Sequence, residues 1–126
     1  MSEADAQNKT SDSFRLIFGR GLVVIVPLVE EIFWRGFLMR WIVGGDDKPF
    51  NRVAFGTHTW KAFIITTLAV MLAHEPVDYL GALIFGSLMY FLAVRTKSLA
   101  ACVLMHAVAN LVLGIYVMNT KQWGFW

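Results

Sequence analysis

The sequence predicts an all-α fold, a polytopic bundle of about four transmembrane helices. Of the 126 residues, 57% are hydrophobic and only 16% are charged. Soluble domains carry about a quarter charged residues, and the mean hydropathy here is +0.58. The apolar residues gather in four segments, and none of these alternates between apolar and polar positions as the strands of a membrane barrel do. The length suits one compact unit.

The first apolar segment covers residues 14–43. It is longer than the roughly 20 residues that cross a bilayer, so we expect it to tilt or to kink at Pro27. A polar turn follows at residues 44–49, Gly-Gly-Asp-Asp-Lys-Pro. Residues 1–13 are polar, and we expect a disordered tail there, ahead of one membrane-embedded unit that spans residues 14–126.

Three further apolar segments complete the bundle. The second spans residues 62–74 and ends at Glu75-Pro76, because proline stops or distorts a helix. The third, residues 79–94, contains small residues that allow close helix contact. The fourth, residues 99–118, is the clearest transmembrane candidate. The chain closes with Trp-Gly-Phe-Trp, which suits an anchor at the membrane interface.

Two adjacent glutamates and an arginine lie inside the first apolar segment. A charged side chain at the centre of a bilayer costs about 3 kcal/mol even on lenient scales. Glu31 and Arg35 are four residues apart and can pair along one helix face. Glu30 is turned by about 100° from Glu31 and faces elsewhere. Glu30 therefore needs a partner, a water-filled cavity or a chemical task.

Three further polar residues stand out in the apolar segments, His74, His106 and Asn110. His106 and Asn110 are four residues apart and share a helix face. Four crossings place both chain ends on one side, and at about 1.5 Å per residue these three residues and Glu30 fall at one depth. Each alone is explained by a hydrogen bond between packed helices. Their common depth favours a functional site.

This set of side chains suits hydrolysis of a peptide bond by an activated water. A carboxylate can accept a proton from water, and a histidine can orient that water or share the proton. A second histidine and an asparagine amide can donate hydrogen bonds to a developing oxyanion. No hydroxyl or thiol nucleophile stands out beside them. The single cysteine, Cys102, is interpreted as a small helix-packing residue.

Three motifs resemble those of the CPBP intramembrane proteases, also called the Abi family, the bacterial relatives of the eukaryotic CAAX-processing endopeptidase. Residues 30–35, Glu-Glu-Ile-Phe-Trp-Arg, resemble the first motif, EExxxR. Residues 70–74 fall where the second, FxxxH, belongs, with valine in place of phenylalanine, and residues 106–110 fit the third, HxxxN. The resemblance covers residues 22–118. The sequence after the glutamates and the C-terminal Gln-Trp-Gly-Phe-Trp also resemble the branch associated with exosortase systems.

The resemblance implies an intramembrane endopeptidase of the bacterial cytoplasmic membrane that cuts membrane-associated peptides or proteins. In the family pattern Glu30 is the general base, His74 helps to bind the water, and His106 with Asn110 forms the oxyanion site. Glu31 and Arg35 support that site structurally. The implied partners are membrane lipid, a membrane-associated substrate and an exosortase system, with no cofactor. Family members commonly carry helices before the first motif, so we expect a minimal or N-terminally truncated core.

Several alternatives stay open. Two histidines and a carboxylate are a legitimate catalytic zinc set, so Glu30, His74 and His106 could bind zinc in a metal-dependent protease. A non-catalytic immunity or scaffold protein could keep the same fold. Intramembrane glutamate and histidine also mark transporters and proton relays. Nucleic acid is not expected as a partner, because the net charge is only +2 and the basic residues are scattered.

The distribution of the basic residues indicates an orientation in the membrane. Three of them lie on the side of the termini, and six lie on the opposite side: Arg40, Lys48, Arg52, Lys61, Arg95 and Lys97. The positive-inside tendency then places the loops after the first and third segments in the cytoplasm.

Overall fold

The computed structural model describes residues 5, 9, 19, 21 and 23–122. This part of the chain is mostly helical and contains no strand, which confirms the all-α class. Its elements in order are the helical residues 23–31, the π-helix η1 (Ile32–Leu38), α2 (Met39–Gly44), the short 3-10 helix η2 (Phe50–Arg52), α3 (Trp60–Leu72), the 3-10 turn η3 (Pro76–Asp78), α4 (Tyr79–Thr96) and α5 (Leu99–Thr120). The predicted tail, residues 1–13, lies outside the described residues apart from Asp5 and Lys9.

The first helix is continuous from residue 23 to Gly44, and Pro27 is buried within it. Its middle is a π-helix, Ile32–Leu38, which begins directly after Glu31 and contains Arg35. Segments of π-helix are rare overall, and those that occur are often found at functional sites. The composition of these residues is compatible with an ordinary α-helix, so the sequence pattern does not predict this change of helical pitch.

Two helices are long and apolar enough to cross a membrane, Pro76–Thr96 and Leu99–Thr120. They agree with the predicted third and fourth segments to within a few residues. The second segment forms a helix of only 13 residues, Trp60–Leu72, which is shorter than the roughly 20 residues that a full span requires. The side chain of Thr59 caps this helix by accepting a hydrogen bond from the backbone N–H of Ala62, and this cap fixes its start beyond the polar loop.

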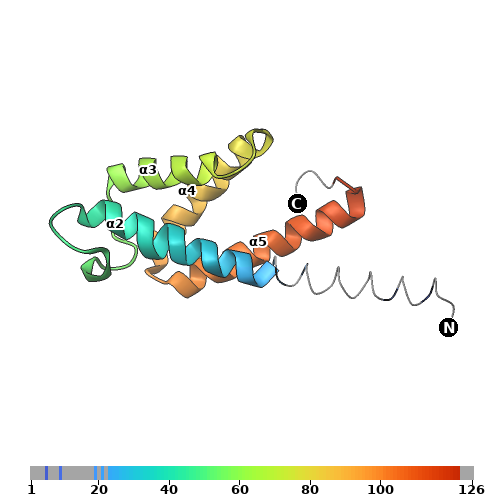
Figure 1. Cartoon of the computed structure of the whole chain (residues 1–126), viewed down its shortest axis with the longest axis horizontal. Helices are drawn as coiled ribbons and strands as arrows, with labels where there is room; N and C mark the ends of the chain where they lie inside the picture. Colours follow the sequence, from blue (N-terminus) through green and yellow to red (C-terminus); the bar gives the residue numbers. More distant parts are fainter. Residues whose placement is uncertain (1–4, 6–8, 10–18, 20, 22, 123–126) are drawn as a thin grey trace.

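The helices pack as neighbours in chain order, with α4 against both α3 and α5 (Figure 1). The loop of residues 45–59 lies at the end of the molecule opposite the C-terminal end of α5 (Figure 1). Buried side chains of α2, α3, α4 and α5 form the core: Met39, Ala62, Met89, Tyr90, Ala93 and Cys102. Cys102 is therefore a packing residue, as its apolar surroundings predict.

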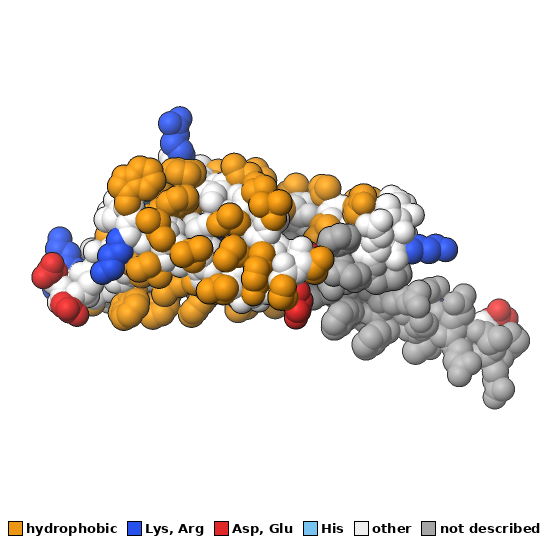
Figure 2. All heavy atoms as spheres, turned by 90° about the horizontal axis from the view of Figure 1, so that it is seen from above, with side chains coloured by type: hydrophobic (Ala, Val, Ile, Leu, Met, Phe, Trp, Pro, Cys, Tyr) orange, Lys and Arg blue, Asp and Glu red, His pale blue; other side chains and the backbone are white. Residues whose placement is uncertain are grey.

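Large apolar side chains are exposed along the middle of the molecule, on α3, α4 and α5. Figure 2 shows this band of hydrophobic side chains, with most of the visible charged side chains toward the ends of the molecule. An exposed apolar band of this extent is the surface that a helical membrane protein presents to lipid. The surface therefore agrees with the membrane setting that the composition predicts.

Candidate functional site: a glutamate pair around one histidine

Glu31 and Arg35 form an ion pair inside the bundle. Arg35 Nη1 donates to Glu31 Oε1 at 3.1 Å, and the two residues are 0% and 1% exposed. Arg35 Nη2 also donates to the backbone carbonyl oxygen of Gly86 in α4 at 3.2 Å. The pairing that the four-residue spacing predicts is present, and it fastens the first helix to α4 as well.

His106 of α5 lies between the two glutamates. Its Nδ1 is 2.7 Å from Glu31 Oε1, and its Nε2 is 3.7 Å from Glu30 Oε2. The ring also makes an edge contact with Phe85 of α4, with 5.1 Å between the ring centroids. Two adjacent carboxylates thus reach opposite nitrogens of one imidazole, although they start about 100° apart around the helix.

The two glutamates differ in access to solvent. The side chain of Glu31 is 0% exposed and that of Glu30 is 36% exposed. Glu31 Oε1 accepts from both Arg35 and His106, whereas Glu30 Oε2 lies beyond ordinary hydrogen-bonding distance from His106 Nε2. Glu31 is therefore committed to internal contacts, and Glu30 is the carboxylate that water or a substrate can reach.

His74 lies in the turn that follows α3, and it is exposed. Its Nδ1 is 2.8 Å from the carbonyl oxygen of Val70. Since a carbonyl can only accept, Nδ1 carries a proton, and in the neutral ring Nε2 is then the nitrogen with the lone pair. Within the described chain, no hydrogen bond or ion pair joins His74 to Glu30 or His106.

Val70, which stands where the second motif has phenylalanine, is 4% exposed. It packs against α4 at Gly86, where a Cβ atom would lie 3.4 Å from Val70 Cγ1. The substitution therefore acts on the packing between α3 and α4, at the level where Arg35 binds the Gly86 carbonyl.

Asn110 lies one helical turn after His106 on α5 and is half-buried. The four-residue spacing places both side chains on the same face of this helix. Among the described residues, no group of three His, Cys, Asp or Glu side chains is placed to hold a metal ion. The set Glu30, His74 and His106, the ligands of the zinc alternative, is thus not gathered as a metal site.

Sequence reasoning missed one member of the cluster, Glu31 as a partner of His106. The four-residue spacing already provides Arg35 as a partner for the Glu31 charge, so the pattern does not indicate a second contact with His106. It also missed the carbonyl of Gly86, because a backbone acceptor in another helix leaves no mark in the side-chain pattern. The sequence shows two adjacent glutamates and a histidine 75 residues further along the chain. This pattern does not indicate which carboxylate binds which ring nitrogen.

The fold and the site define a class: a helical membrane protein with a buried glutamate–arginine pair that holds a histidine beside a second, accessible glutamate. Residues 12–112 match the family described as type II CAAX prenyl endopeptidase Rce1-like. This match covers most of the chain and contains all three motifs, so the chain belongs to this family of membrane-embedded proteases. No curated protein and no solved structure matches the chain.

Proposed function

We propose that this protein is an intramembrane endopeptidase that hydrolyses peptide bonds of membrane-associated peptides or proteins with a water activated by Glu30. The observation that carries the proposal is the contrast between the two glutamates. Glu31 is buried and bound by two donors, whereas Glu30 is accessible and faces His106 Nε2 at 3.7 Å. Membership of a peptidase family supports the reaction class.

In the proposed reaction Glu30 accepts a proton from water while the water oxygen attacks the carbonyl carbon of the scissile peptide. The carbonyl oxygen becomes an oxyanion in the tetrahedral intermediate. Glu30 then returns the proton to the amide nitrogen as the carbon–nitrogen bond breaks, which releases an amine and a carboxylic acid. All atoms of the product come from the substrate and one water.

His106 and Asn110 are the proposed oxyanion donors, from one face of α5. His106 Nδ1 donates to the Glu31 carboxylate, so Nε2 becomes a donor when the ring is cationic. The buried Glu31 carboxylate at 2.7 Å fixes the orientation of the ring. Glu31, itself held by Arg35, is in this scheme the positioning residue for His106.

His74 is the proposed ligand of the water. Its Nδ1 proton is occupied by the Val70 carbonyl, so its Nε2 lone pair can accept a hydrogen bond from water. We further propose a bacterial cytoplasmic membrane as the location and metal-independent chemistry as the mechanism. A prenylated C-terminal peptide is the first substrate to test, because the family description includes prenyl endopeptidases.

The test is cleavage of a membrane-peptide library, with prenylated and unmodified members, by the full chain in liposomes. Glu30→Gln keeps the size of the side chain and removes the base, and we expect the rate to fall about 10²–10⁴-fold. Glu75→Gln, an exposed glutamate outside the cluster, is the matched control and should cleave like wild type. Unchanged cleavage by Glu30→Gln would exclude Glu30 as the base.

Two further arms separate the alternatives. Thorough chelation leaves cleavage intact if the reaction is metal-independent and abolishes it in a zinc enzyme. Full biological activity of both Glu30→Gln and His106→Ala would instead identify a non-catalytic immunity or scaffold protein. Proton flux in the same liposomes, without cleavage, would identify a proton relay.

A further inference from the structure

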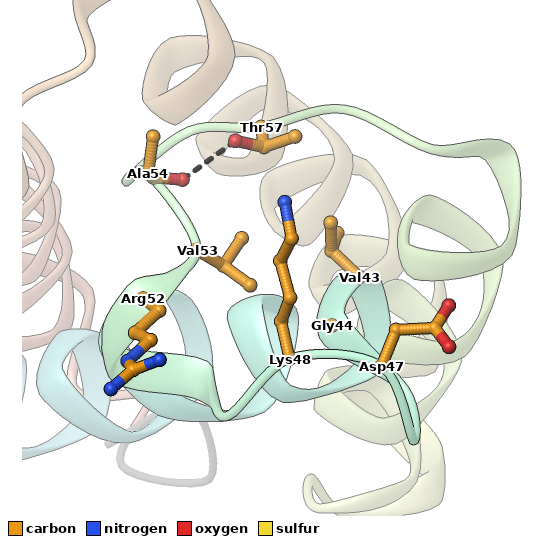
Figure 3. A pocket seen from close by; sticks show the side chains of 8 residues that line it. All are labelled: Val43, Gly44, Asp47, Lys48, Arg52, Val53, Ala54 and Thr57. Carbon is orange, nitrogen blue, oxygen red and sulfur yellow. Dashed lines mark hydrogen bonds between the residues drawn. The ribbon is translucent and has the colours of Figure 1, made fainter.

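A cavity of about 490 Å³ lies at the loop end of the molecule, between α2 and residues 47–57. Its charged lining residues are Asp47, Lys48 and Arg52, and its apolar wall includes Val53 (Figure 3). This cavity is formed by other residues than the glutamate–histidine cluster, and the proposed protease reaction assigns it no task.

Lys48 is the central side chain of this cavity. Figure 3 shows its aliphatic chain crossing the cavity and its amine pointing inward past Val53. The amine makes no hydrogen bond or ion pair with any residue that the structure describes. The neighbouring Asp47 carboxylate points away from it, and the Arg52 guanidinium points outward on the other side (Figure 3). An ammonium group with no partner among the described residues thus lies in a space large enough for a ligand.

The walls of the cavity are held in place by two other basic residues. Arg40 donates from Nε to the Val53 carbonyl at 2.8 Å and from Nη2 to the Asn51 carbonyl at 3.2 Å. Lys97, at the end of α4, donates from Nζ to the Gly56 carbonyl. These bonds fix the loop to the helix ends, so the cavity is preformed. Arg40 and Lys97 thus hold the loop in place. The side chains of Lys48 and Arg52 make no such bond to a described residue and remain available to a ligand.

This end of the molecule has the features of a membrane surface. The two candidate spans, Pro76–Thr96 and Leu99–Thr120, meet here at the Lys97–Ser98 connection. Trp41 and Trp60 are 55% and 67% exposed, and tryptophan is enriched at membrane interfaces. Residues 40–61 and 95–97 together carry six basic and two acidic side chains. Basic pockets at the ends of transmembrane helices bind anionic lipid headgroups.

We propose that this cavity binds the phosphate group of an anionic phospholipid headgroup, with Lys48 as its main contact and Arg52 at its edge. The inference is independent of the proposed protease activity, because it rests on other residues. A lipid is favoured over a free anion, since the cavity lies at the end of the molecule where the two candidate spans meet and where Trp41 and Trp60 are exposed.

The experiment measures lipid binding to the purified full chain in neutral detergent by native mass spectrometry. Phosphatidylglycerol is titrated against phosphatidylcholine for wild type and for Lys48→Gln, Arg52→Gln and Lys61→Gln. Lys61 is the matched control, because it is exposed at the start of α3 and outside the cavity. We expect preferential binding of phosphatidylglycerol and a loss of affinity of about fivefold in Lys48→Gln. Smaller losses are expected for the other two variants, and Lys48→Arg should bind like wild type.

Three results would overturn the proposal. Equal losses in Lys48→Gln and Lys61→Gln would show attraction by the general surface charge, without a site. Equal binding of both lipids would exclude recognition of the anionic headgroup. Displacement of phosphatidylglycerol by millimolar inorganic phosphate would show that the cavity prefers a free anion. A thermal melt of each variant, unchanged from wild type, excludes an effect through folding.

Discussion

Replacing Glu31 by glutamine removes the negative charge on which Arg35 and His106 both depend. Glu31 Oε1 accepts from Arg35 Nη1 at 3.1 Å and from His106 Nδ1 at 2.7 Å. Arg35 is 1% exposed, and its Nε has no hydrogen-bond partner among the described residues. In the variant Arg35 keeps its hydrogen bond to the Gly86 carbonyl oxygen but loses the negative charge that balances its own.

The expected cost follows from this burial. Removing one partner of a buried ion pair costs about 3–5 kcal/mol, because the other charge is left uncompensated away from water. An exposed pair would cost less than about 1 kcal/mol. Since both side chains are fully buried, we expect Glu31→Gln to lower the free energy of unfolding by about 3–5 kcal/mol.

The assay is unfolding of the purified chain in mixed micelles by increasing denaturing detergent, followed by circular dichroism. Glu30→Gln is the control on the neighbouring residue. Its side chain is 36% exposed and accepts no short hydrogen bond from a described residue, so we expect a stability change within about 0.5 kcal/mol. The two variants should thus differ in what they lower: Glu31→Gln strongly lowers stability, whereas Glu30→Gln lowers the proposed cleavage rate and leaves stability almost unchanged.

A double-mutant cycle with Arg35→Gln tests the cause. If the pair is the source of the loss, the double variant should lose about 0.5–3 kcal/mol less than the sum of the single variants. Strict additivity, or a loss below about 1 kcal/mol in Glu31→Gln, would refute the reasoning and show that the pair contributes no more than a surface contact.

Two further stability predictions follow from the backbone and from a buried hydroxyl. Gly56 has φ +73°, and a Cβ atom would lie 2.3 Å from the Ala93 carbonyl oxygen. Gly45 is the control, because it has φ +54° and no atom within 4 Å of a new Cβ. Both alanine variants carry a backbone cost of about 1–3 kcal/mol. Gly56→Ala should therefore lower the free energy of unfolding by more than Gly45→Ala. Thr67 is 3% exposed, and its hydroxyl has no partner in the described part of the chain, so Thr67→Val should stabilise by about 1 kcal/mol. Thr96→Val removes an exposed hydroxyl that is bonded to the Leu92 carbonyl, so this control should not stabilise the protein. A lower stability of Thr67→Val in the same detergent titration would contradict this account.

The local features of the protein could be read from its sequence. The helical class follows from apolar segments of membrane length, and the bounds of α4 and α5 follow from polar and proline breaks. The pairing of Glu31 with Arg35 was predictable because both residues lie on one helix, where a spacing of four fixes their separation. The motif order also identified the family that the comparison shows.

The contacts between helices were decided by the tertiary structure. Glu31 and His106 are 75 residues apart in the chain, and Arg35 reaches a backbone oxygen 51 residues away. Such contacts depend on how each helix is rotated about its axis and on the π-helix at Ile32–Leu38, neither of which the hydrophobic pattern encodes. The sequence by itself therefore determined which polar residues lie within apolar segments. Only the packing of the helices decided that the buried glutamate holds His106 and that its neighbour, Glu30, is left accessible.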